Sequence, residues 1–270
     1  MAGTASLTIQ LLGRLEIRAG GTLIRVTGRH AQALLGLLAI HPRLRLRDTI
    51  AAELWPEADG PSASSLRQAL WLIRSGFSSA GLAADDWIET DQDSLGLRRD
   101  VLLDVDIDRF GRMAVAPCPE DAEAALALYA GDLLEGLGHE CFAAERERLS
   151  DLYEDLLAAV AGQRLDRGDL AGARWAATEL LGRDPLREEA HAVLIALYGR
   201  TGSRSQIVRQ YRRLCGILRS ELSVTPLPET DATYRDALAG ATARSHDRVA
   251  ELGYAARRQP AFERVLVPSA

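Results

Sequence analysis

The sequence predicts a mainly α-helical protein: an N-terminal winged helix-turn-helix with a small β-sheet and a wing hairpin, followed by an all-α, tetratricopeptide-like helical array. The first hundred residues read as a sheet, three helices and a hairpin, in that order. From residue 104 onward almost every segment has helical periodicity, interrupted by short glycine or proline breaks. We therefore expect a winged helix at 1–100, a helical array at 104–243 and a C-terminal tail at 244–270.

The composition favours a helical protein of the cytoplasm. Of the 270 residues, 47% are hydrophobic but only 5% are aromatic, which favours helix over sheet. The chain has no long apolar run and its opening residues do not resemble a signal peptide. Its three cysteines, Cys118, Cys141 and Cys215, form no disulfide framework. We expect a cytoplasmic protein without a membrane span.

The charges exclude some kinds of chemistry. All 32 basic residues are arginine, so no lysine is present to serve a phosphate-binding loop, a Schiff base or a general base. The net charge of −6 does not indicate a nucleic-acid binder, but it does not exclude one, because such a footprint is local.

The N-terminal segment predicts a small antiparallel sheet. Hydrophobic residues alternate loosely over Leu7–Gly13 and continue over Leu15–Arg18. A turn at Ala19–Gly21 leads to a further alternating run at Leu23–Val26.

Two helices follow the sheet. The first is expected over 29–40, where Ala33, Leu34, Leu37 and Leu38 share one face, and it ends at His41-Pro42. The second is expected from Asp48, as its N-cap, to about Trp55.

The stretch PRLRLRD between these helices alternates leucine and arginine. We expect Leu44 and Leu46 to point inward, and Arg43, Arg45 and Arg47 to point outward. The three arginines are then candidates for contacts with phosphate, as are Arg98 and Arg99 after the hairpin. Each could equally be part of a solvated charged edge. Residues 1–100 hold 11 arginines and 11 acidic residues, a low positive charge for a DNA-binding domain.

The third helix, SASSLRQALWLIRSGF over 62–77, has two distinct faces at helical spacing. The face expected in the core comprises Leu66, Ala69, Leu70, Ile73 and Phe77. The opposite face comprises Ser64, Arg67, Gln68, Trp71, Arg74, Ser75 and Ser78.

This outward face has the residue types of a helix that reads the major groove. Arginine can bond guanine and glutamine can bond adenine, each through two hydrogen bonds. An ordinary amphipathic helix with a solvated polar face remains the alternative. Trp71 would contact DNA, or would pack against the hairpin that follows Trp87 and turns at Asp91–Ser94.

The second half of the chain predicts six helices, at 121–134, 141–167, 170–182, 187–201, 203–222 and 229–239. An internal repeat is visible, since Arg167-Gly168-Asp169 precedes Thr201-Gly202-Ser203 by 34 residues. That period is typical of tetratricopeptide repeats, which stack helix pairs into a binding surface and rarely carry catalysis.

Catalytic and metal-binding motifs are missing from the sequence. The five histidines, His30, His41, His139, His191 and His246, show no metal-ligand spacing with each other or with cysteine. We interpret acidic pairs such as Asp85-Asp86, and the series Asp104, Asp106 and Asp108, as solvated linker charge. Arg209, Arg212 and Arg213 are interpreted as a solvated helix face. No enzyme activity, cofactor or metal is predicted.

Several strings resemble a known family. They are LYAGDLLEG, FAAERERLSDLY, RGDLAGA, RDPLREEAHAVLIALYGRTG and QYRRLCGILRSELSVTPLPET. Together they resemble the bacterial transcriptional activator domain, and with the winged helix they resemble the SARP regulators of antibiotic pathways over roughly 7–243. The resemblance implies a dimer that binds direct repeats in double-stranded DNA and recruits RNA polymerase, with Ser64 to Phe77 as its recognition helix. The chain departs from the family at Leu72 and Ser75, where arginines are usual.

The first hypothesis is therefore a cytoplasmic DNA-binding transcriptional activator. Its predicted DNA contacts are Ser64, Arg67, Gln68, Trp71, Arg74, Arg43, Arg45, Arg47 and Arg98. The alternative is a tetratricopeptide-type adaptor that binds protein, with a winged helix that has lost its affinity for DNA. The neutral charge of residues 1–100 and an exposed Trp71 and Leu72 would favour the adaptor.

Overall fold

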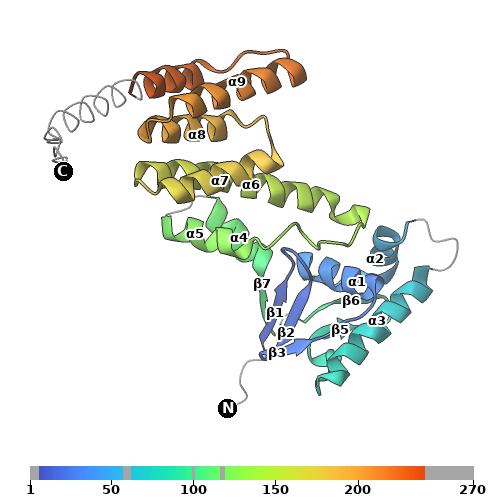
Figure 1. Cartoon of the computed structure of the whole chain (residues 1–270). Helices are drawn as coiled ribbons and strands as arrows, with labels where there is room; N and C mark the ends of the chain where they lie inside the picture. Colours follow the sequence, from blue (N-terminus) through green and yellow to red (C-terminus); the bar gives the residue numbers. More distant parts are fainter. Residues whose placement is uncertain (1–5, 57–61, 99–100, 116–118, 241–270) are drawn as a thin grey trace, which may run out of the picture. The chain divides into compact units, whose positions relative to one another are not determined.

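A computed structural model describes residues 6–56, 62–98, 101–115 and 119–240 (Figure 1). The chain divides into two compact units, Met1–Leu156 and Leu157–Ala270. Helix α6 runs from the first unit into the second. Among the described residues, no helix is both long enough and apolar enough to cross a membrane.

The first unit begins with a four-stranded sheet. Strands β1 (Ser6–Gln10), β2 (Glu16–Ala19) and β3 (Thr22–Ile24) form the predicted antiparallel sheet, and β7 (Leu102–Val105) lies parallel to β1 at the sheet edge. The sequence does not predict β7, because Asp104, Asp106 and Asp108 resemble the charges of a solvated linker. Ile9 pairs with Ile17 on one side and with Val105 on the other, so the buried centre of the sheet joins both ends of the winged helix.

Three helices and a hairpin complete the winged helix-turn-helix, as predicted. They are α1 (Arg29–Ile40), α2 (Arg47–Leu54), α3 (Ser62–Ser79) and the hairpin of β5 (Ile88–Thr90) with β6 (Ser94–Leu97). A two-residue strand, β4 (Arg45–Leu46), adds to β6 and makes a second sheet. The cap of α2 differs from the prediction: Leu46 is the N-cap, and Asp48 lies in the first turn, where its carboxylate still faces the positive end of the helix.

The expected orientation of the PRLRLRD stretch is confirmed for Arg43, which is exposed, and wrong for the four residues that follow it. Leu44 is 40% exposed and Leu46 is 58% exposed, whereas Arg45 and Arg47 are half-buried. Arg45 forms an ion pair with Glu53 of α2, and Arg47 donates a hydrogen bond to the Asp91 carbonyl oxygen. Because both guanidinium groups find acceptors inside the domain, they turn inward and the leucines face solvent.

The residues after the hairpin are not a solvated linker. Helices α4 (Asp106–Ala114) and α5 (Pro119–Leu128) follow β7, and Asp106 is only 2% exposed. Its Oδ1 and Oδ2 atoms accept hydrogen bonds of 2.8 and 2.9 Å from the Leu11 amide, and Oδ2 accepts one of 2.9 Å from the Leu12 amide. Burial raises the pKa of Asp106, and hydrogen bonds from backbone amides oppose that shift. The carboxylate thus fastens the chain beyond β1 to the first turn of α4.

A further backbone junction lies beside Asp106. Leu134 donates its amide to the Leu11 carbonyl and Glu135 donates to that of Gly13, both at 2.8 Å. This pairing explains why α5 ends at Leu128, short of the predicted Leu134, whose φ is 51°. The start of the helical array is therefore built into the same compact unit as the winged helix.

The remaining helices are α6 (Ala143–Asp166), α7 (Leu170–Arg183), α8 (Glu188–Arg200) and α9 (Arg204–Glu221), with a last helical segment at 228–240. In the second unit α7 packs on α8 and α8 packs on α9. The predicted tail from 244 onward lies outside the described residues.

The turns of the second unit carry the predicted 34-residue repeat. Gly168 and Gly202 have φ values of 81° and 73°, which favour glycine. The next residue after each glycine donates its amide to a carbonyl five residues back, from Asp169 to Arg164 and from Ser203 to Tyr198, both at 2.9 Å. The same helix-ending turn is thus formed at the same place in successive repeats.

We expect Asp106→Ala to lower the free energy of unfolding by about 2–4 kcal/mol, because two buried amides lose their acceptor. Urea unfolding followed by circular dichroism measures the change. Asp104→Ala is the matched control: Asp104 forms a partly exposed ion pair with Arg109 at 3.2 Å, so its loss is expected to cost less than about 1 kcal/mol. Equal losses for the two variants would contradict an anchoring role for Asp106.

Candidate nucleic-acid interface

The two faces of α3 are arranged as the sequence predicts. Leu66, Ala69, Leu70, Ile73 and Phe77 are all buried at 5% exposure or less. The predicted outward residues are all exposed: Ser64, Arg67, Gln68, Trp71, Arg74, Ser75 and Ser78. Five buried side chains in register therefore hold the helix rigidly while it presents its polar face to solvent.

A close backbone contact sets the position of α3. A Cβ atom on Gly76 would lie 2.7 Å from the Arg25 carbonyl oxygen, so only glycine lets the helix approach this segment. Leu72 contacts the same segment from the next turn, since a Cβ on Gly28 would lie 2.9 Å from its Cδ1 atom. Leu72 is thus half-buried, which corrects the expectation that it is exposed.

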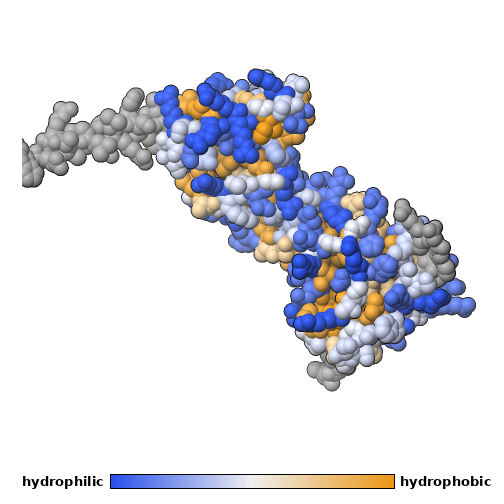
Figure 2. All heavy atoms as spheres, turned by 45° about the vertical axis from the view of Figure 1, so that its right-hand side comes forward, coloured by the Kyte–Doolittle hydropathy of each residue, from blue (hydrophilic) through white to orange (hydrophobic). Residues whose placement is uncertain are grey.

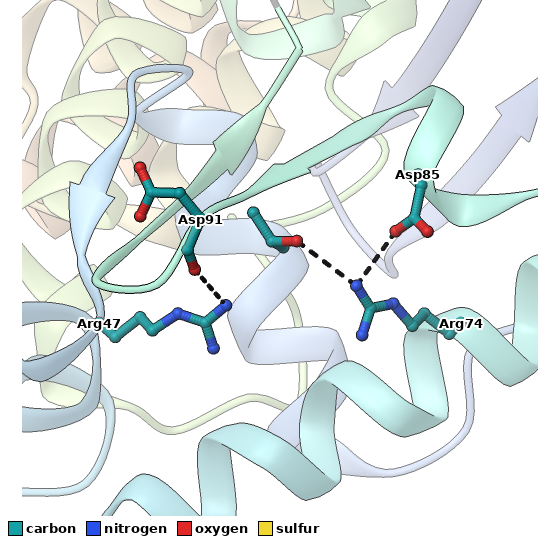
Figure 3. A network of polar contacts seen from close by, with 5 residues as sticks. Arg47, Arg74, Asp85 and Asp91 are labelled. Carbon is teal, nitrogen blue, oxygen red and sulfur yellow. Dashed lines mark hydrogen bonds and ion pairs between the residues drawn. The ribbon is translucent and has the colours of Figure 1, made fainter.

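Two arginines hold the wing against the helices (Figure 3). Arg47, at the start of α2, donates from Nη2 to the Asp91 carbonyl oxygen at 3.0 Å. Arg74 of α3 donates from Nη2 to Asp85 Oδ1 at 3.1 Å and to Thr90 Oγ1 at 3.5 Å. These contacts connect the wing to both helices of the helix-turn-helix.

The carboxylate of Asp91 shapes the tip of the wing. Its Oδ1 atom accepts hydrogen bonds from the amides of Asp93 and Ser94, at 2.9 and 2.5 Å. This arrangement is an Asx turn, in which an aspartate side chain replaces a backbone acceptor. Asp91 therefore has a structural role in the wing, although its charge also lowers the local positive charge.

The arginines predicted to contact DNA, whether at bases or at phosphates, differ in how available they are. Arg43 and Arg67 are exposed, and within the described parts of the chain their side chains have no hydrogen-bond or ion-pair partner. Arg45, Arg47 and Arg74 bond to the protein itself. Arg98 is half-buried and its amide donates to the Trp87 carbonyl at 2.9 Å, while Arg99 lies outside the described residues. The predicted residues therefore lie on one domain but are not equally available.

Trp71 does not pack against the hairpin. Trp87 is 4% exposed and its ring lies 6.5 Å from that of Phe77, whereas Trp71 is 66% exposed. An exposed tryptophan in the middle of a helix face is a surface that a binding partner can cover. Over the surface shown in Figure 2, apolar and hydrophilic side chains are interspersed.

Sequence reasoning missed the partners of the arginines. Asp85 resembles linker charge in the sequence, and nothing in the sequence gives Glu53 a role.

The described residues contain no cluster of three or more histidine, cysteine or acidic side chains that could hold a metal ion. His191 is buried, bonded to Gln210 at 2.8 Å and to the Pro185 carbonyl at 3.1 Å. Arg209, Arg212 and Arg213 are exposed on α9, as predicted.

Comparison with known proteins agrees with this architecture. Residues 108–238 match the family model of the bacterial transcriptional activator domain. The structure of Mycobacterium tuberculosis EmbR in complex with a low-affinity phosphopeptide is similar over 95% of this chain and 73% of that chain, with a TM-score of 0.67 and 20% sequence identity, a likeness of fold. No curated protein matches the chain. The resemblance to the bacterial transcriptional activator domain is thereby confirmed over residues 108–238.

We expect Gly76→Ala to destabilise the protein by about 1–3 kcal/mol, because the added methyl group would meet the Arg25 carbonyl and displace α3. Thermal and urea unfolding measure the effect. Gly162→Ala in α6 is the control: a Cβ there meets no atom within 4 Å, so it is expected to stabilise by about 0.5–1 kcal/mol. A neutral Gly76→Ala would show that α3 can shift without cost.

Proposed function

We propose that the protein is a DNA-binding transcriptional activator of the cytoplasm and not an enzyme, because residues 108–238 match the bacterial transcriptional activator domain and follow a winged helix. The observation that carries the proposal is the exposed face of α3. Ser64, Arg67, Gln68 and Trp71 all point to solvent from a helix whose other face is fully buried. Such a rigid, polar helix face is what major-groove recognition requires.

In this proposal α3 enters the major groove. Arg67 bonds the N7 and O6 atoms of a guanine, and Gln68 bonds the N6 and N7 atoms of an adenine. Ser64, on the N-terminal part of the helix, contacts a phosphate or a base edge at close range. Trp71 covers apolar parts of the groove, such as a thymine methyl group.

The remaining arginines act on the backbone of the DNA. Arg43 and Arg98 contact phosphates, while Arg45 and Arg47 keep the helix-turn-helix and the wing in place. Arg74 reaches DNA by exchanging Asp85 for a phosphate. Its ion pair with Asp85 is exposed and therefore weak, so the exchange costs little.

The balanced charge of the winged helix makes a single copy a weak binder, with 11 arginines against 11 acidic residues in 1–100. A homodimer on two direct repeats doubles the contacts and compensates for this. The helical domain then supports dimerisation and recruits RNA polymerase. The proposed activator binds no cofactor and no membrane.

The function is tested by incubating the full-length protein with fragmented genomic DNA at two salt concentrations and sequencing the retained fragments. We expect fragments with direct repeats to be enriched. Affinity is expected to fall about ten- to a hundredfold between roughly 50 and 200 mM salt, as for a few phosphate contacts. No enrichment at the lower salt concentration would reject DNA binding and favour the protein-binding adaptor.

We expect Arg67→Ala to weaken binding to an enriched site by about 1–3 kcal/mol and to relax the base preference at one position, because a bidentate contact to guanine is lost. Competition assays with single-base variants of the site measure both effects. Arg167→Ala, an exposed arginine between α6 and α7, is expected to change neither. A loss equal on all sequences would instead make Arg67 a phosphate contact.

A further inference from the structure

A pocket of about 510 Å³ lies in the first unit, and the residues that line it are different from the proposed DNA contacts. It is formed by the start of α1, the end of α2, one residue of α3 and the segment between α5 and α6. Its volume is within the range of sites that bind small molecules. Neither the DNA contacts nor the helical repeat gives this pocket a role.

Flat rings form much of its wall. The ring of His30 lies 5.2 Å from that of Trp55, tilted by 57°, and 6.4 Å from that of His139, at 74°. Leu54 and Pro56 add aliphatic surface next to Trp55. Aromatic groups pack well on rings in tilted or offset arrangements, so the wall suits a planar, largely apolar ligand.

The charges of the pocket favour an anion. Arg29 donates from Nη2 to the Gly136 carbonyl at 2.7 Å, and within the described residues no carboxylate pairs with it. The carboxylate of Glu53 is already paired with Arg45. Burial lowers the pKa of His139, and the nearby His30 and Arg29 lower it further. The one other acidic side chain of the lining, that of Glu140, is exposed.

Two lining residues also have unused hydrogen-bonding capacity. Trp55 Nε1 and His139 Nδ1 are buried and have no hydrogen-bond partner among the described residues. An indole nitrogen can only donate, so Trp55 Nε1 reaches an acceptor only if its ring shifts when a ligand binds. As it stands, the wall offers one fixed positive charge beside a flat apolar surface.

We propose that this pocket binds a small planar organic acid, an aromatic or heteroaromatic carboxylate. Arg29 holds the carboxylate, and the rings of Trp55, His30 and His139 enclose the planar part. The ligand would also contact Ser65 on α3 and Gly138 in the segment between α5 and α6. One molecule would thus touch both the proposed recognition helix and a segment of the activator domain.

The test uses the full-length protein labelled with ¹⁵N and follows the indole N–H signals of its four tryptophans. Trp55→Phe assigns the Trp55 signal. The probes are indole-3-acetate and 1-naphthoate, each paired with its neutral amide. We expect each acid to shift the Trp55 signal saturably, with Kd below about 1 mM, and each amide to bind at least about tenfold more weakly. Signals of Trp87 and Trp175 are expected to stay in place.

Arg29→Gln is expected to reduce the affinity for the acids to that for the amides while the amides bind as before, which also shows that the variant is folded. Arg219→Gln, an exposed arginine on α9, is the control and is expected to bind the acids normally. The proposal is overturned if neither acid shifts the Trp55 signal at about 1 mM, if acid and amide bind equally, or if Arg29→Gln binds the acids unchanged. None of these measurements requires DNA, so they stand apart from the proposed function.

Discussion

The buried carboxylate of Asp106 is the constraint on which the first unit depends. It accepts amide hydrogen bonds from Leu11 and Leu12, and it sits where β7 passes into α4. With the chain fixed there, the segment around Leu134 can pair with the end of the first strand. That pairing places Gly136 within reach of Arg29, and it brings the ring of His139 close to that of His30 in α1. A charge held at the cost of desolvation thus joins the winged helix to the helices that follow.

Features that depend on local periodicity could be predicted from the sequence. Both faces of α3 follow from the 3.6-residue repeat, because burial of Leu66, Ile73 and Phe77 determines which residues are exposed. The turns at Gly168 and Gly202 follow from glycine's access to positive φ and from their spacing. In each case the residue and its neighbours in the sequence are enough to predict the local structure. The exposed residues proposed to contact DNA belong to this class.

Features that depend on a distant partner could not be predicted. Alternation within a two-residue strand does not decide which side is buried, and Glu53 turned Arg45 inward. Asp106 resembles linker charge until the amides of residues 11 and 12 surround it. Of the two alternatives for Trp71, packing on the hairpin is not seen: Trp71 stays exposed, and Phe77 is the residue of α3 whose ring lies beside Trp87. Charged and aromatic side chains can satisfy themselves in several ways, and only the tertiary structure selects one.

The acceptors that bond the arginines inside the protein also determine how this domain can recognise DNA. A guanidinium group bonded inside the protein adds rigidity but no free charge, and this is the state of Arg45 and Arg47. Recognition then depends on base contacts by the exposed face of α3 more than on attraction to phosphate. Such a balance gives low affinity for arbitrary DNA, because nonspecific binding is almost entirely electrostatic. A winged helix with no net charge is therefore compatible with selective binding, provided that two copies act together.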